Sequence, residues 1–211
     1  HRAEWAYPKR GLEYYPAGPG PGEGRWAIGG IWMIAPMFTA NYRRGLGSGF
    51  SADARLRTIV LYNELGVGAE WAARAGPFSL GVMAHLDAFF GVLGKAFLET
   101  TQFDATGWGL ILDPGVKAGL QVARDAWLTL QLEAFLSLYQ SSNLGGLVVS
   151  PKAALFEGAA ASLVVEHAVG KGVVYYGASL YHTRENYPLW FNVDYSPQRI
   201  WYLGVQAGYE F

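Results

Sequence analysis

The sequence predicts an all-β fold in which eight antiparallel strands close into an up-and-down barrel. Three observations predict it: apolar residues alternate with small or polar ones, the connections are alternately short and long, and the chain ends on an alternating segment. Because successive side chains of a strand point to opposite faces, a sustained period of two indicates extended strands. A helical chain would instead repeat its apolar residues at i, i+3, i+4 and i+7.

The segment 201–211 shows the alternation most completely. One face carries apolar side chains, with aromatic rings towards both ends: Trp201, Leu203, Val205, Ala207, Tyr209 and Phe211. The other face carries small or polar residues: Tyr202, Gly204, Gln206, Gly208 and Glu210. We therefore expect a strand whose outer face meets an apolar medium and whose inner face meets a polar one.

The same pattern recurs along the chain. It predicts eight strands at about 25–37, 56–74, 78–91, 107–124, 126–139, 148–168, 173–184 and 198–211. The segment 126–139 is the clearest, since Leu128, Leu130 and Leu132 alternate with polar residues. The segment 25–37 is apolar on both faces, so its register stays open.

The connections between these segments differ systematically in length. Short turns are expected at 74–77, 124–125 and 169–172, and longer connections at about 38–55, 92–106, 140–147 and 185–197. This alternation is typical of barrels that span a membrane, whose periplasmic turns are short and whose external loops are longer. It predicts that both termini lie in the periplasm.

The composition fits strands that cross a bilayer better than helices. Hydrophobic residues make up 51% of the chain and charged residues 16%, and there are 28 glycines. A transmembrane helix needs about 20 mostly apolar residues, whereas a tilted strand needs only about 9–11. The charge-free run 26–42 is interrupted by glycine, proline and polar residues, so it does not predict a helical span.

Charge and cysteine content exclude several other classes of protein. The net charge is −1 and no block of lysine or arginine is present, which argues against nucleic acid as a partner. There is no cysteine, so disulfides and thiolate metal sites are excluded. The chain does not start with methionine, and we expect a mature chain whose secretion signal has been removed.

The terminal Phe211, the even strand number and the alternating connections together resemble the small OmpA/OmpX/OmpW-like barrels of bacteria. The resemblance implies a monomeric, porin-like transmembrane β-barrel in the outer membrane of a Gram-negative cell envelope. Its partners would be outer-membrane lipid and lipopolysaccharide. The alternative is an edge strand of a soluble sandwich or of a lipocalin-like barrel.

Two regions are expected, a tail over 1–24 and the barrel over 25–211. The tail is rich in proline and glycine, which favours an extended or irregular segment. We expect a disordered periplasmic lead-in. Its aromatic residues, Trp5, Tyr7, Tyr14 and Tyr15, leave open that it folds into the barrel mouth or binds an envelope protein.

The predicted inner face carries many charged side chains. They are Glu64, Glu70, Arg74, His85, Asp87, Lys117, Arg124, Glu133, Glu166 and Glu210. Buried charges must be paired or hydrogen-bonded, so we expect a network of ion pairs across the strands. The interior of an eight-stranded barrel is only wide enough for side chains, so no open pore is expected.

No metal or other cofactor is expected. His85 and Asp87 share a face and form a possible metal or proton-relay pair, but two ligands are too few for a closed metal site. A hydrogen-bonded histidine of the lumen is the preferred interpretation.

One residue suggests catalysis on the lipid-facing side. His182 is predicted to face outward at the external end of its strand. This placement resembles that of the catalytic histidine in lipid A deacylases, where a serine lies two residues further along the same strand. Here the matching position is Arg184, so the nucleophile that the resemblance implies is missing. A polar rim that contacts lipid phosphates is the preferred interpretation, and a catalytic His182 is the alternative.

The last external loop is strongly aromatic, with Tyr187, Trp190, Phe191 and Tyr195. It either anchors the barrel at the membrane surface or binds a ligand or partner protein. The expected function is therefore a structural or protein-interaction role in the cell envelope. One alternative is a lipid A-modifying enzyme. The other is a conduit for small hydrophobic molecules, a role to which OmpW-like barrels are linked. The apolar side chains predicted to face inward at Met83, Phe89 and Phe135 favour the conduit.

Overall fold

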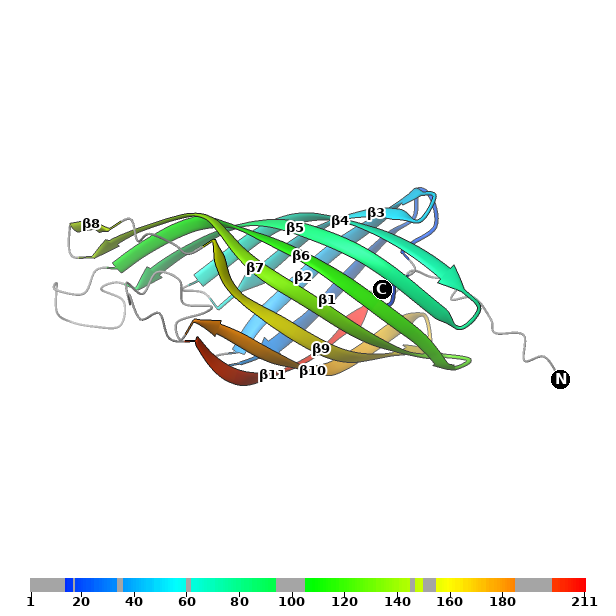
Figure 1. Ribbon diagram of the computed structural model, residues 1–211. Helices are drawn as coiled ribbons and strands as arrows, with labels where there is room; N and C mark the ends of the chain where they lie inside the picture. Colours follow the sequence, from blue (N-terminus) through cyan, green and yellow to red (C-terminus); the bar gives the residue numbers. More distant parts are fainter. Residues whose placement is uncertain are drawn as a thin grey trace.

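The computed structural model describes residues 14–16, 18–33, 36–59, 62–93, 105–144, 147–149, 155–184 and 199–211. The regular structure of these residues is entirely β (Figure 1). The strands are β1 (Gly24–Trp32), β2 (Pro36–Gly47), β3 (Phe50–Thr58), β4 (Tyr62–Ala75), β5 (Phe78–Leu93), β6 (Ala105–Ala123), β7 (Ala126–Leu144), β8 (Leu147–Val149), β9 (Phe156–Val169), β10 (Gly172–Arg184) and β11 (Arg199–Glu210). No helix in this part of the chain is long and apolar enough to cross a membrane.

Each long strand pairs antiparallel with its neighbours in the sequence, and β1 pairs with β11, which closes the sheet into a barrel (Figure 1). The short β8 pairs only with the end of β7 and lies outside the ring, so the barrel has ten strands. The prediction of an antiparallel up-and-down β-barrel is confirmed. The predicted number of eight strands is wrong.

The two additional strands come from the segment 38–55, which the sequence predicts as an external loop. This segment is the hairpin of β2 and β3. Gly47 (φ 97°), Ser48 (φ 52°) and Gly49 (φ 82°) have positive φ angles there, a conformation that glycine adopts without steric cost. The glycines that suggest a loop therefore make only a tight turn.

The neighbouring boundaries shift with this hairpin. The predicted strand 25–37 stops at Trp32, and the predicted strand 56–74 is divided by a turn between Thr58 and Tyr62, where the Ile59 amide donates to the Tyr62 carbonyl at 3.0 Å. Short and long connections consequently do not alternate strictly. Only three residues separate β1 from β2 and β3 from β4, at the end of the barrel where the sequence predicts only long loops.

The two ends of the barrel can be told apart by their connections. We call the turn end the one that holds the turns 48–49, 76–77, 124–125 and 170–171, together with the start of β1 and the end of β11. The opposite end is called the loop end. The backbone of Trp26 pairs with that of Phe211 at the turn end, with N···O distances of 2.9 and 3.2 Å.

The outer face of the barrel is apolar along its length. Aliphatic side chains are exposed between the two ends, among them Leu65, Val67, Leu80, Val116, Leu132, Leu163, Leu180, Leu203 and Val205. Exposed aromatic rings gather near the turn end at Phe50, Trp71, Phe78, Tyr209 and Phe211, and near the loop end at Trp32, Phe38, Phe90, Trp108, Tyr139 and Trp201. An apolar band between two aromatic girdles is the surface pattern of transmembrane β-barrels.

Candidate functional site in the barrel lumen

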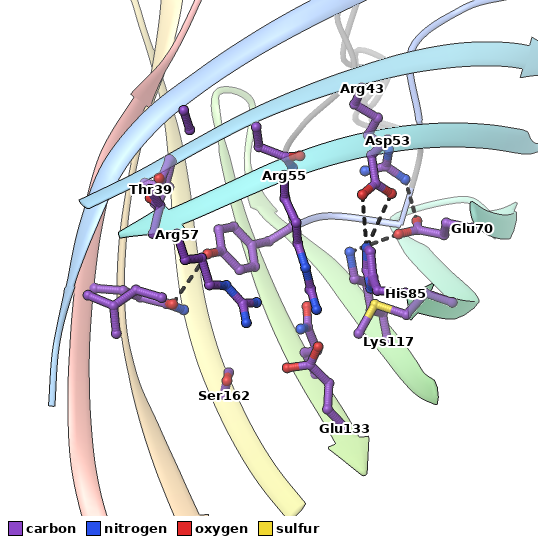
Figure 2. Close-up of a pocket in the computed structure, with 18 of the residues that line it drawn as sticks. Thr39, Arg43, Asp53, Arg55, Arg57, Glu70, His85, Lys117, Glu133 and Ser162 are labelled. Atoms are coloured by element: carbon purple, nitrogen blue, oxygen red, sulfur yellow. Dashed lines mark hydrogen bonds and ion pairs between the residues drawn. The ribbon is translucent and has the colours of Figure 1, made fainter. Parts of the chain in front are cut away.

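The middle of the lumen is filled by charged side chains from β2 to β6 (Figure 2). Glu70 of β4 forms ion pairs with Arg43 of β2 at 2.6 Å and with Lys117 of β6 at 2.8 Å. All three side chains are buried. Strands that are not adjacent in the sheet are thus joined across the barrel interior.

A second ion cluster centres on Arg55 of β3. Its Nε donates to Asp87 Oδ1 at 2.7 Å, and its Nη2 approaches both Asp87 and Asp113 Oδ2, the latter at 2.5 Å. A Cβ added at Gly66 would lie 2.8 Å from the Asp87 carboxyl carbon and 2.9 Å from Arg55 Cγ. Because Gly66 of β4 has no side chain, it leaves the space in which Arg55 and Asp87 contact each other.

Two smaller groups complete the charged layer. Arg57 pairs with Glu64 at 2.8 Å, and the Tyr62 hydroxyl donates to the same carboxylate at 3.1 Å. His85 Nε2 lies 3.0 Å from Asp53. His85 thus has a hydrogen-bonding partner in the lumen, and the described residues contain no group of three or more side chains placed to hold a metal ion.

The charged layer surrounds a small polar cavity of about 90 Å³, shown in Figure 2. Its lining includes Arg43, Arg55, Arg57, His85 and, from β7, Glu133. A cavity of this size holds a few water molecules, and its polar walls supply partners for them. It has no room for a solute of the size of a sugar or a nucleotide.

An apolar layer lies in the lumen on the side of the loop end. It consists of Met37, Tyr62, Phe89, Ile111, Phe135, Ala160 and Tyr181, all buried and in mutual contact. The ring of Tyr181 stacks on that of Tyr202 with 4.9 Å between centroids and 5° between planes. A cavity of about 20 Å³ is lined by residues of both layers, among them Met37 and Phe135 on one side and Arg57 and Glu64 on the other.

A second apolar cluster, formed by Tyr15, Trp127 and Val173, lies in the lumen at the turn end. The expectation of a lead-in without fixed contacts is therefore wrong for Tyr14 and Tyr15. Their backbone amides both reach the buried carboxylate of Glu166. The division of the chain into a tail over 1–24 and a barrel over 25–211 stays a prediction. The first strand, β1, begins at Gly24.

The predicted lumen residues are placed as follows. Glu64, Glu70, His85, Asp87, Lys117, Glu166 and Glu210 are buried, while Arg74 and Glu133 are half-buried. Glu166 and Arg74 belong to the turn end and do not join the central ion pairs: Arg74 donates to Gln121 at 2.8 Å. Arg124 is exposed, because it lies in the β6–β7 turn, beyond the last residue of β6. Its predicted inward position is wrong.

Sequence reasoning missed several charged residues of the central layer. Arg43, Asp53 and Arg55 lie in the segment 38–55, which the sequence predicts as a loop. Arg57 and Asp113 lie in the predicted strands 56–74 and 107–124 but are not among the predicted residues of the lumen. A signal was present in 51–58, where polar residues alternate with alanine and leucine. Alanine gives too little hydrophobic contrast for this alternation to stand out.

His182 faces outward from β10, as predicted, and is half-buried. Its imidazole stacks on Trp201 with 4.3 Å between ring centroids, and Ala159 is its partner on β9. The neighbouring Thr183 points inward and donates to the Tyr202 hydroxyl at 3.2 Å. The side chain of Arg184 and the aromatic loop with Tyr187, Trp190, Phe191 and Tyr195 lie outside the described residues.

No protein-family model matches the chain, and no curated protein matches it. The chain is similar to the N-terminal β-barrel domain of Pseudomonas aeruginosa OprF, with a TM-score of 0.43 and 10% identity over 91% of this chain and 99% of that domain. It is also similar to the KdgM porin in complex with oligogalacturonate (TM-score 0.45, 8% identity, 89% of this chain, 98% of the porin). A third similar structure is the outer membrane protein Omp33 of Acinetobacter baumannii (TM-score 0.35, 11% identity, 96% of this chain, 99% of Omp33). These structural neighbours are bacterial outer-membrane β-barrels.

Proposed function

We propose that this protein is an integral β-barrel of the bacterial outer membrane whose lumen is closed. Its role is then structural, or lies in interaction with other envelope proteins, and it is not an open pore. The observation that carries the proposal is the filling of the lumen: a layer of buried ion pairs lies between an apolar layer at the loop end and the Tyr15 cluster at the turn end.

The outer face supports the membrane location. A soluble protein seldom exposes contiguous apolar patches larger than a few hundred Å². Here exposed aliphatic residues surround the barrel between two sets of aromatic rings. Lipid acyl chains would cover the aliphatic band, and the headgroups of phospholipid and lipopolysaccharide would lie at the level of the rings. We place the turn end, with both chain ends, in the periplasm.

The energetics of the lumen support the closed state. A path through the barrel would have to separate pairs such as Arg55–Asp113 and Lys117–Glu70, which are buried. Removing one partner of a buried ion pair is unfavourable by about 3–5 kcal/mol. Thermal fluctuation of one side chain therefore does not open a passage.

Planar-bilayer recordings of the purified, refolded protein test the proposal. We expect no stepwise conductance under conditions in which a general porin conducts. Insertion is controlled independently by flotation of the protein with liposomes and by its β-type circular dichroism spectrum. Reproducible conductance steps from folded protein would contradict the closed lumen.

The two alternative functions receive less support from the geometry. Against the enzyme, the cross-strand partners of His182 are Ala159 and Trp201, neither of which is a nucleophile. Against the conduit, the lumen between Met83 and Phe135 contains charged side chains. We expect the mass spectrum of lipid A from outer membranes to be the same with this protein and with its His182→Ala variant. A mass change that requires His182 would establish the enzymatic function instead.

A further inference from the structure

The turn end of the lumen contains a short segment of chain that is not part of any strand. The backbone amides of Tyr14 and Tyr15 donate to the two oxygens of Glu166, at 2.9 and 2.7 Å. Tyr15 and Glu166 are both fully buried. A carboxylate that accepts two consecutive main-chain N–H groups recognises the backbone of a peptide, whatever its side chains.

The Tyr15 side chain occupies a pocket of its own. Its hydroxyl donates to the Pro77 carbonyl at 3.1 Å, and its ring lies 6.4 Å from that of Trp127. The Arg74 guanidinium lies 5.8 Å from the ring centroid, in the range of a cation–π contact. Such a pocket selects an aromatic residue with a hydrogen-bonding tip.

Further contacts fix the residues on either side of Tyr15. The Tyr14 hydroxyl donates to Gln206 at 3.2 Å, and its ring lies 5.2 Å from that of Tyr175. On the other side, Pro16 lies against the inner wall at Gly81, where an added Cβ would be 3.0 Å from Pro16 Cβ.

The barrel wall is shaped around this segment. A Cβ added at Gly119 would lie 2.5 Å from Tyr15 Cε2 and 2.6 Å from the Ser79 hydroxyl oxygen. Real Cβ atoms essentially never come so close to another atom. Gly119 on β6 therefore provides the space that the tyrosine ring fills.

Tyr14, Tyr15 and Pro16 are held by these contacts, whereas the backbone of the sheet holds the chain further on, between Pro21 and Glu23. Pro16, Pro19 and Pro21 have no N–H group and cannot donate to a strand ladder. In the described part of the chain, the contacts of this stretch with the sheet backbone centre on Gly45, through a bridge at Pro21 and through backbone hydrogen bonds of Gly22 and Glu23 at 2.9 and 3.0 Å. The segment can therefore leave the mouth without breaking the hydrogen bonds that close the barrel.

From this geometry we propose that the turn-end mouth of the barrel is a peptide-binding site, occupied in cis by Tyr14–Pro16. Its ligand is an extended peptide with two consecutive aromatic residues followed by proline. Glu166 binds the backbone, and the Trp127 pocket binds the second aromatic ring. The same site accepts such a peptide in trans when the cis segment leaves. The site includes the Tyr15 cluster at the turn end, but the central ion pairs and the apolar layer near the loop end stay in the lumen when the segment leaves. The proposal therefore does not depend on a closed lumen.

Disulfide trapping tests the occupied state. The chain has no cysteine, so an introduced pair reports on one contact only. In the variant Pro16→Cys with Gly81→Cys, the two Cβ atoms start 3.0 Å apart, so a small outward shift of residue 16 brings them to the separation of about 3.5–4.5 Å found in disulfides. We expect this pair to oxidise almost completely in the folded, full-length protein.

The matched control pairs Pro16→Cys with Leu80→Cys, whose side chain is exposed on the outer face. We expect no cross-link from that pair. Circular dichroism confirms that both variants are folded. Absence of the cross-link in folded Pro16→Cys/Gly81→Cys protein, or equal cross-linking of both pairs, would overturn the proposal.

Competition tests the binding in trans. A capped peptide with the sequence of residues 13–18 is added before oxidation of the Pro16→Cys/Gly81→Cys protein. Because a tethered segment has an effective concentration in the range of about millimolar, the peptide is used at several millimolar. We expect the cross-linking rate to fall to roughly half or less, by the same effective-concentration argument.

The control peptide carries alanine in place of the residue that corresponds to Tyr15. We expect it to leave the cross-linking rate unchanged, since it cannot fill the Trp127 pocket. If neither peptide changes the rate, or if both slow it equally, the mouth is not an exchangeable peptide site, and the proposal is wrong.

Discussion

At the scale of single residues, Arg55 is the most constrained cation in the barrel. It contacts both Asp87 and Asp113, and the three side chains are all buried. One guanidinium thus lies between two carboxyl groups and contacts both of them. Without it, two carboxylates would face each other in the lumen.

The variant Arg55→Ala is therefore expected to lower the free energy of unfolding by about 3–5 kcal/mol, the usual effect of orphaning a buried charge. Urea unfolding of the protein in lipid vesicles, followed by tryptophan fluorescence, measures the change. Arg124→Ala is the matched control, because Arg124 is exposed in a turn, and we expect an effect within about 0.5 kcal/mol. Equal effects of the two variants would show that the ion cluster contributes nothing to stability.

At the scale of secondary-structure elements, the β2–β3 hairpin determines the size of the barrel. Its turn depends on the positive φ angles of Gly47, Ser48 and Gly49. A residue with a Cβ has a strained backbone at such angles unless, like asparagine, it tolerates the left-handed region.

We expect Gly49→Ala to lower the free energy of unfolding by about 1–3 kcal/mol, through strain at a φ of 82°. Ser48→Asn is the control, and we expect it to change stability by less than about 0.5 kcal/mol. The same urea titrations measure both variants. A Gly49→Ala protein as stable as the original would mean that the turn relaxes without strain.

The hairpin also shows how far the sequence predicts the structure. The period-two pattern predicts the barrel, the antiparallel order and the inward side of strands such as 78–91, where hydrophobic contrast is high. It fails in 38–55, where alanine, arginine and aspartate alternate with little contrast and glycines suggest a loop. The central ion pairs could be predicted only in part, because each of those described above except Lys117–Glu70 has one partner in this hairpin.

The N-terminal segment shows a second limit of sequence reasoning. Its proline and glycine content fits the described residues 14–16 and 18–23, which form no strand, but composition says nothing about a specific acceptor for its amides. Glu166 lies far away along the chain, and its pairing with Tyr14 and Tyr15 depends on the closed barrel. Contacts of this kind follow from the tertiary structure alone.

At the scale of the whole molecule, the outer surface distinguishes a membrane barrel from a soluble one. Val205 lies midway along β11 on the exposed face, and Tyr209 lies on the same face near the turn end. In a bilayer the two positions differ in depth, whereas in water both would be simply exposed.

We expect Val205→Arg to lower the free energy of unfolding of the protein in lipid vesicles by about 2–4 kcal/mol, because an arginine near the bilayer midplane is unfavourable. Tyr209→Arg is expected to change it by no more than about 1 kcal/mol, because interfacial positions tolerate the charge. Folding titrations in phosphatidylcholine vesicles measure both. Equal, small effects would favour the soluble lipocalin-like alternative.

The pairing of Trp26 with Phe211 has a consequence for the kinetics of folding. The first and last strands of the ring hydrogen-bond to each other, so the contact that completes the barrel joins residues from opposite regions of the sequence. Contacts of such high sequence separation carry a large loop-closure entropy and slow the folding reaction. Until this seam forms, β1 and β11 both present unpaired edges, to which another chain can add. Assembly of this barrel is therefore most exposed to aggregation in its last step, after most of the hairpins are already in place.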